Sequence, residues 1–124
     1  MKIILCHSIL KREVVPLLDH FSKGDIKKFS EKAIKGLGIE IQGTIPPHTK
    51  LVKVYMTGKA GAGRMVVLIL MRKELCIPII VRLKKDKVVG SNLGKENQAF
   101  QKLLEKNLDG IMMDLKEKKY EELS

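Results

Sequence analysis

The chain has 124 residues, of which 44% are hydrophobic and 31% are charged, with 24 Lys and Arg against 14 Asp and Glu. This length suits one compact domain, residues 1–124, and charges of mixed sign along most of the chain exclude general disorder. No apolar run is long enough to span a bilayer, and the segment 1–6 is too short for a signal peptide, so a cytoplasmic protein is expected.

The N-terminal third predicts a strand followed by two helices. Residues 2–6 are an apolar run of strand length, and apolar residues then recur at helical spacing over 8–21. Pro16 predicts a break near the middle of this first helix, because proline cannot continue the backbone hydrogen bonds. Asp25 is expected to cap the start of the second helix, and Gly36 is expected to end it.

The rest of the chain predicts three strands and a long helix. Strands are expected at 50–56, 64–71 and 76–83, where Val, Ile and Leu are frequent, with Pro78 at an edge or a bulge. Short turns predict antiparallel pairing, and a helix with one apolar stripe is expected from about 96 to 117. The predicted fold class is therefore α+β, a small antiparallel sheet with two N-terminal helices and a long C-terminal helix.

Positive charge is concentrated in the strand-rich part of the chain. Ten basic residues lie between positions 50 and 87, opposed by two acidic residues, whereas the remainder is nearly neutral. The ten are Lys50, Lys53, Lys59, Arg64, Arg72, Lys73, Arg82, Lys84, Lys85 and Lys87. A local positive field on or beside a sheet attracts polyanions, which favours RNA or DNA as the partner. The alternative is a solvated basic surface without a specific ligand.

Residues suited to metal or hydrolase chemistry are sparse. The three histidines are scattered along the sequence, and no Cys and His have the spacing of a zinc site. Cys6 and Cys76 lie in apolar runs, where free cysteine behaves as a small hydrophobe. No Gly-x-Ser-x-Gly nucleophile turn occurs. We therefore expect neither a metal nor a cofactor.

A glycine-rich segment, 58–64, joins the first two predicted strands. It lacks the Gly-Lys-Ser/Thr ending of a phosphate loop and does not lead into a helix, so we interpret it as a flexible connection. Lysine and arginine alone can still support RNA cleavage, because a lysine of lowered pKa can act as a base and an arginine can bind the phosphate. Strand alternation predicts that Arg82 and Lys84 share one face, and the alternative for both is solvated charge at a strand end.

Three stretches, taken in order, resemble the RelE/ParE toxin superfamily, in particular its RelE/HigB-like branch. Residues 45–54 are similar to that branch's Ile-Pro-Gly-Thr-Gly-Gly-Leu-Arg-Lys-Leu-Arg segment, and residues 58–66 to its Gly-Lys-x-Gly-Gly-x-Arg-Val turn and strand. Residues 82–87 are similar to its Tyr-Ala-Lys-Asn-Glu-Lys ending. The likeness covers residues 1–115 in topology and about 45–93 in specific residues.

The resemblance implies the toxin of a type II toxin–antitoxin pair. Such a protein would be a metal-independent, ribosome-dependent mRNA endonuclease that inhibits translation, with mRNA, the ribosome and a cognate antitoxin protein as partners, and with no membrane partner. Carried across by position, the candidate catalytic residues are Arg64, Lys84 and Lys53. The candidate RNA-binding residues are Lys50, Lys59, Arg82, Lys85 and Lys87.

Two positions depart from the family pattern. Arg82 stands where the family often has Tyr, and Tyr55 stands where the pattern has Arg. Tyr120 is the only aromatic residue after Phe100. These departures leave open a non-catalytic binding protein of the same fold, which would inhibit the ribosome or gyrase or be an inactive toxin. A third alternative is an unrelated RNA-binding α+β domain, although an aromatic content of 4% argues against broad base stacking.

Overall fold

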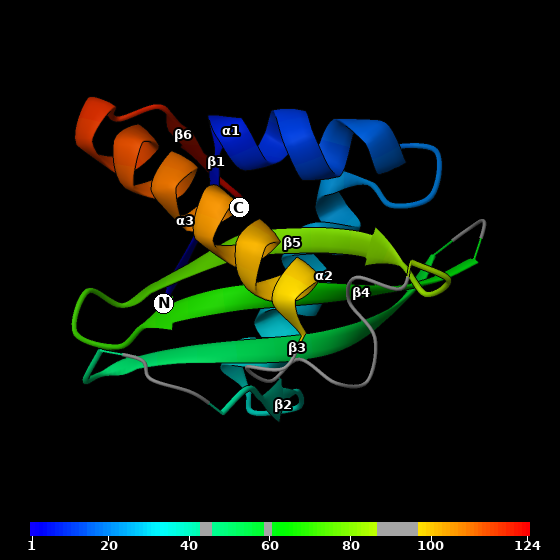
Figure 1. The fold of residues 1–124 in the computed structure, drawn as a ribbon, viewed down its shortest axis with the longest axis horizontal. Coiled ribbons are helices and arrows are strands. Elements are labelled where there is room, and N and C mark those ends of the chain that lie inside the picture. Colours follow the sequence, from blue (N-terminus) through cyan, green and yellow to red (C-terminus); the bar gives the residue numbers. More distant parts are fainter. Residues whose placement is uncertain (43–45, 59–60, 87–96) are drawn as a thin grey trace.

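A mixed β-sheet with helices on both faces forms the protein (Figure 1). The computed structural model describes residues 1–42, 46–58, 61–86 and 97–124. Within these residues six strands are hydrogen-bonded in the order β2-β3-β4-β5-β1-β6. Their bounds are β1 (Lys2–Cys6), β2 (Ile39–Glu40), β3 (Thr49–Gly58), β4 (Gly61–Leu70), β5 (Leu75–Leu83) and β6 (Tyr120–Glu122). The predicted α+β class is therefore confirmed.

Three consecutive strands, β3, β4 and β5, form the antiparallel centre of the sheet. β3 and β4 pair along their full lengths, in keeping with their content of Val, Ile and Leu. Along β5 the register shifts by one residue, because Val66 of β4 is opposite Ile80 whereas Val67 is opposite Pro78. Pro78, which has no backbone N–H to donate, thus lies at a bulge, as its position in the sequence predicted.

The N-terminal strand β1 gives the sheet its parallel part. β1 runs parallel to β5, with Lys2 opposite Leu75 and Ile3 opposite Cys76, and antiparallel to β6. The predicted antiparallel sheet is therefore confirmed only in part, because this pair is parallel. The long connection between β1 and β5 contains helices and the strands β2, β3 and β4, and a connection of this length allows two strands to run in the same direction. The short strands β2 and β6 were also not predicted.

The helical segment after β1 changes its winding twice. α1 (His7–Ile9) continues into the π-helical η1 (Leu10–Val14) and then into the 3₁₀-helical η2 (Val15–Leu17), which contains Pro16. The predicted break near the proline is therefore confirmed. π-Helical segments are rare and wider than an α-helix, and here the segment buries Glu13 together with Val14.

The second helix, α2 (Lys23–Ile34), begins with a capping box. The Ser22 hydroxyl accepts a hydrogen bond from the Asp25 N–H at 3.1 Å, and the Asp25 carboxylate accepts one from the Ser22 N–H at 2.9 Å. The prediction of Asp25 as the N-cap is wrong, because Asp25 is the third helical residue and Ser22 is the cap. Gly36 ends the helix at a φ of 83°, as predicted.

The C-terminal helix, α3 (Gln98–Glu117), lies close to its predicted range. The Asn97 side chain caps its start by accepting a hydrogen bond from the Phe100 N–H at 3.0 Å. Near its end, the Asp114 carboxylate accepts a hydrogen bond from the Ser8 N–H at 2.8 Å, which joins α3 to the start of α1. None of the helices in the described part of the chain is long and apolar enough to cross a membrane.

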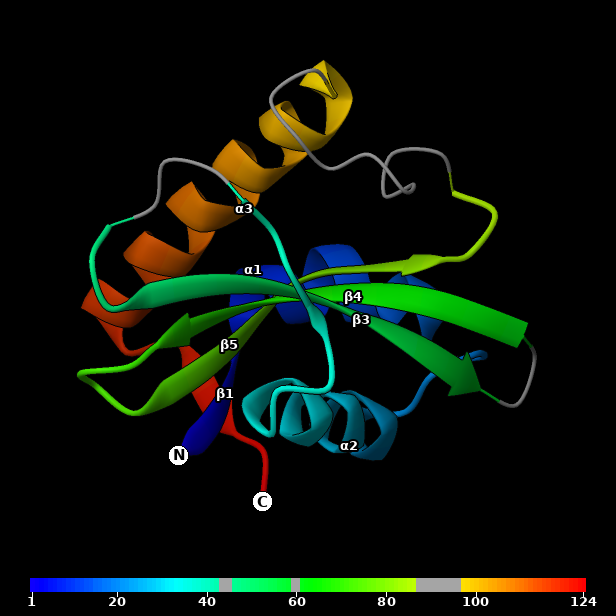
Figure 2. The ribbon, with the colours of Figure 1, turned by 90° about the horizontal axis from the view of Figure 1, so that it is seen from below.

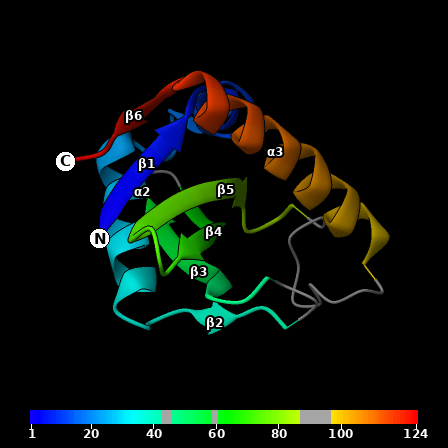
Figure 3. The same ribbon diagram turned by 90° about the vertical axis from the view of Figure 1, so that its left-hand side faces the viewer.

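The helices form layers on the two faces of the sheet. α2 lies under one face and α3 crosses the other, with α1 beside α3 (Figures 2 and 3). Phe21, just before α2, is buried against Gly63 of β4, so Gly63 faces the α2 side. Strand alternation then directs the next residue, Arg64, to the α3 side.

Beyond the short pairing with β1, backbone groups at the edge of β5 form hydrogen bonds with side chains. The Ile79 carbonyl accepts a hydrogen bond from the Asn107 amide of α3 at 2.9 Å. The Val81 N–H donates to the Glu13 carboxylate of η1 at 2.9 Å. Because buried backbone groups without partners are costly, these two contacts replace the hydrogen bonds of a neighbouring strand.

The packing at Gly63 generates a stability prediction. A Cβ at this position would lie 2.5 Å from the Phe21 ring and 2.8 Å from the Arg82 carbonyl oxygen. We expect Gly63→Ala to lower the free energy of unfolding by about 1–3 kcal/mol, as overpacking does. The matched control is Gly24→Ala in α2, where the nearest atom would be 3.5 Å away, and a gain of about 0.5–1 kcal/mol is expected. Urea denaturation measures both, and equal effects at the two glycines would contradict the prediction.

Candidate functional site

A row of polar side chains crosses the α3-facing side of the sheet. Tyr55 of β3 is directly opposite Arg64 of β4, which is directly opposite Arg82 of β5. Directly opposed residues on neighbouring strands project from the same face. Lys53 lies two residues before Tyr55 and therefore shares this face. The register thus brings together the phenol and three basic residues of the predicted basic segment.

Lys53 and Arg64 both approach the ring of Tyr55. The Lys53 Nζ lies 5.2 Å from the ring centroid, and the Arg64 guanidinium carbon lies 5.6 Å from it. Both distances are within the range of cation–π attraction. Lys53 is only 4% exposed whereas Tyr55 is 51% exposed. The cluster therefore offers a phenol to solvent, supported from below by a buried ammonium group.

The surroundings of Tyr55 lower the pKa of its phenol below the ordinary value of 10.0. The main cause is a hydrogen bond from Lys53, followed by the positive charge of Lys53, with a smaller contribution from Arg64. Partial burial opposes the shift. Because both cations favour the phenolate, Tyr55 is suited to accept a proton and, once protonated, to return it.

Arg64 is held by the backbone that follows β5. Its Nη1 donates a hydrogen bond to the Lys84 carbonyl oxygen at 3.3 Å. The Lys84 N–H in turn donates to the Ala62 carbonyl at 2.9 Å. Lys84 lies just past the end of β5 and is exposed. The backbone of Lys84 therefore positions the guanidinium, while its side chain faces solvent beside the cluster.

Arg82 is engaged by two carboxylates. Its Nε and Nη2 donate to the two oxygens of Glu13 at 3.0 and 2.9 Å, and its Nη1 donates to Asp86 at 3.3 Å. The hydrogen bond to Glu13 is the main reason that the pKa of Arg82 is raised. Glu13 is 2% exposed, so this bidentate contact is largely shielded from water. Arg82 therefore joins η1 to β5, and the two carboxylates balance its positive charge.

Two other predicted RNA-binding residues, Lys50 and Lys85, are described and are not part of the cluster. Lys50 projects from the α2 side of the sheet, because it is three residues from Lys53, and it lines a pocket of about 340 Å³ with Gly36 and Gly38. Lys85 is exposed beside Arg82. The two predicted residues in glycine-rich and post-strand connections, Lys59 and Lys87, lie outside the described residues.

Two residues of this region were not selected from the sequence: Tyr55, which was noted only as a departure from the family pattern, and Glu13. The signal for Tyr55 was available in the register: strands that meet at Gly58 and Gly61 place positions 55 and 64 opposite each other. The signal for Glu13 was its spacing, four residues after Ile9 on an otherwise apolar helical stripe.

Other reactive groups offer no second centre in the described part of the chain. No three His, Cys, Asp or Glu side chains among residues 1–42, 46–58, 61–86 and 97–124 are placed to hold a metal ion. Burial raises the pKa of Cys6 and of Cys76 to about 12, and Asp114 adds to the shift at Cys6. Both thiols are therefore protonated near neutral pH and poorly nucleophilic.

The chain was compared with known proteins at three levels. No protein-family model, no curated protein and no solved structure matches it.

The cause of the Tyr55 shift can be tested spectroscopically. The chain has two tyrosines and no tryptophan, so Tyr120→Phe leaves Tyr55 as the single phenol absorbing as tyrosinate. We expect this phenol to titrate below 10.0, and Lys53→Met to raise its pKa, since the variant removes the largest cause of the shift. Ultraviolet titration measures the pKa. The matched control is Lys50→Met on the opposite side of the sheet, which should leave it unchanged; an equal rise in both variants would contradict the assignment.

Proposed function

We propose that the protein is the toxin of a type II toxin–antitoxin pair and acts as a metal-independent endonuclease on mRNA at the ribosome. The single observation that carries the proposal is the Lys53–Tyr55–Arg64 cluster, an exposed phenol of lowered pKa between two cations. The motifs that resemble the RelE/ParE superfamily and the concentration of basic residues between 50 and 87 support it. The proposal includes a cytoplasmic location and a cognate antitoxin protein as the silencing partner.

RNA cleavage without a metal needs a base, a phosphate-binding group and an acid. In the proposed reaction, the Tyr55 phenolate accepts the proton of a ribose 2′-OH, whose oxygen forms a bond to phosphorus while the bond to O5′ breaks. The Arg64 guanidinium binds the non-bridging oxygens and stabilises the charge that develops on them. Lys84, exposed beside Arg64, is the candidate proton donor to O5′. The products are a 2′,3′-cyclic phosphate and a 5′-hydroxyl.

Lys53 has a different role in this scheme from the one predicted from the sequence. Its side chain is almost fully buried beside the ring of Tyr55, and it is the main cause of the lowered pKa of that phenol. We therefore propose Lys53 as a positioning residue that holds Tyr55 ready to accept a proton. Its loss should move the pH dependence of cleavage upwards, in step with the pKa of Tyr55.

The second candidate function is a non-catalytic protein of the same fold that inhibits the ribosome or gyrase. The observation that favours it is the engagement of basic residues within the protein. Arg82 binds Glu13 and Asp86, and Lys53 is buried against Tyr55, so two cations on this face are less available to a phosphate. This candidate predicts inhibition without RNA cleavage.

Cleavage of mRNA in a purified translation system tests the proposal. We expect the wild-type chain to cut ribosome-bound mRNA and to leave 2′,3′-cyclic phosphate and 5′-hydroxyl ends, the products of attack by the 2′-OH. Arg64→Gln and Tyr55→Phe should each lower the rate by about 100-fold or more, because each removes a group that acts on the reacting atoms. Tyr120→Phe is the matched control and should retain the wild-type rate.

Two results would contradict the proposed nuclease. If translation stops while the mRNA stays intact, the non-catalytic candidate is favoured. If Tyr120→Phe loses as much activity as Tyr55→Phe, the cluster is not the site of the reaction.

A further inference from the structure

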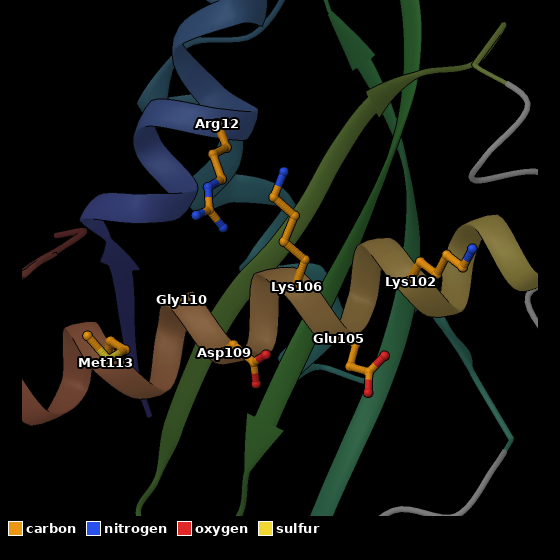
Figure 4. Close-up of a pocket in the computed structure, with 7 residues that line it drawn as sticks. All are labelled: Arg12, Lys102, Glu105, Lys106, Asp109, Gly110 and Met113. Carbon is orange, nitrogen blue, oxygen red and sulfur yellow. The ribbon is translucent and has the colours of Figure 1, made fainter.

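Two grooves on the side of the molecule that carries η1 and α3 share one residue, Arg12. The larger groove, of about 520 Å³, lies between Arg12 of η1 and one side of α3 (Figure 4). The second groove, of about 310 Å³, lies between η1, η2 and the end of β5. Because Arg12 lines both, the two hollows meet at its side chain.

The larger groove presents positive charge. Three basic residues, Arg12, Lys102 and Lys106, and two acidic ones, Glu105 and Asp109, line this groove, so its lining is positive by one charge. Arg12 and Lys106 extend into the space between η1 and α3, and the two carboxylates point away from that space (Figure 4). Among the described residues, no carboxylate forms an ion pair with Arg12 or Lys106. Lys102 lies one helical turn from Lys106, a rise of about 6 Å. The side chains that face this groove therefore favour an anionic ligand.

The smaller groove is positive for a different reason. It contains two carboxylates, Glu13 and Asp86, but both bind the guanidinium of Arg82. The other two basic residues of this groove are Arg12 and Lys85. Neither forms an ion pair in the described part of the chain. Arg82 offsets one of the two carboxylate charges, and with Arg12 and Lys85 the lining of this groove carries a net positive charge.

The smaller groove begins next to the Lys53–Tyr55–Arg64 cluster. Arg82, which lines it, is directly opposite Arg64 in the sheet register. Arg64 also binds the carbonyl of Lys84, the residue before Lys85. The basic side chains therefore follow one another from the cluster along β5 to η1 and then along α3.

We propose that the phosphate backbone of a single-stranded RNA follows these two grooves away from the cluster, with Lys85, Arg12 and Lys106 as successive contacts. This inference rests on the proposed RNA ligand of the cluster and extends it to a path for the strand. Among the described residues that line the two grooves none is aromatic, so the contacts are with phosphates and are independent of base sequence. On this path, a strand longer than the cleaved step is bound through its phosphates, which needs few aromatic residues.

Binding of labelled RNA of two lengths tests the path. The probes are 2′-O-methyl single strands, which cannot be cut, of about 4 and about 20 nucleotides. Arg12→Gln/Lys106→Gln should weaken binding of the long probe by about 25-fold near 0.1 M salt and lower the salt slope by about 1.4, the value for two phosphates. Binding of the short probe should not change. Lys102→Gln/Lys106→Gln, on exposed positions of α3, provides a second variant if the first is poorly folded.

The matched control removes the same net charge elsewhere. Lys28→Gln/Lys35→Gln changes two exposed lysines at α2 and its end, on the opposite side of the sheet, and should leave the affinity for the long probe near that of the wild type. Equal losses in both pairs would mean that net charge alone sets affinity, and the path would be wrong. Binding of polyglutamate but not of RNA would assign the grooves to an acidic protein and also overturn it.

Cleavage separates this inference from the proposed function. If Arg64 is required for cutting but the groove variants bind the long probe like the control, the path fails and the nuclease stands. If the groove variants lose the long probe but the wild type cuts no RNA, the nuclease fails and the path stands.

Discussion

The buried carboxylate of Glu13 is the contact on which much of this structure depends. It accepts a hydrogen bond from the Val81 N–H and two from Arg82, so one side chain joins η1 to the edge of β5. A buried carboxylate without such partners would be strongly unfavourable. β1 pairs with β5 only at Leu75 and Cys76. The Glu13 carboxylate supplies a hydrogen-bond partner further along the same edge, at Val81. This one ionic group therefore holds η1 against the edge of β5.

The same contact divides the basic residues into two classes. Arg82 is balanced by Glu13 and Asp86, whereas Arg64 on the neighbouring strand is turned towards the ring of Tyr55. Two guanidinium groups that face each other across a strand pair would repel, and a carboxylate beside one of them relieves that repulsion. Proximity in sequence therefore does not decide which cations reach a ligand.

Much of the fold could be predicted from the sequence because its signals are local. The apolar stripe that includes Phe100 and Ile111 predicted α3, and runs of Val and Ile predicted the central strands. β6 could not be predicted, because Tyr120–Glu122 is a short polar segment that becomes a strand only through pairing with β1. The parallel pairing of β1 with β5 was missed for a similar reason, since the segments are about 70 residues apart in sequence.

The candidate site was predictable only in part. Lys53 and Arg64 could be chosen because they lie in the stretches that resemble the toxin family. The structure places both beside the ring of Tyr55. Composition could not separate Lys50 from Lys53, because only the alternation of β3 shows that they lie on opposite faces. Nor could it identify the partners of Arg82, because Glu13 is 69 residues away and reaches β5 through the π-helical winding of η1.

The place of β1 between β5 and β6 has a consequence for the order of assembly during synthesis. Of the six described strands β1 is made before the others, and its neighbours are a strand that begins at Leu75 and one that begins at Tyr120. Until both have left the ribosome, β1 is a nascent segment with two open edges, and open edges pair readily with other chains. Completion of the sheet is thus coupled to the last residues of the fold, and the hairpin of β3 and β4, which carries the phenol, can form well before it.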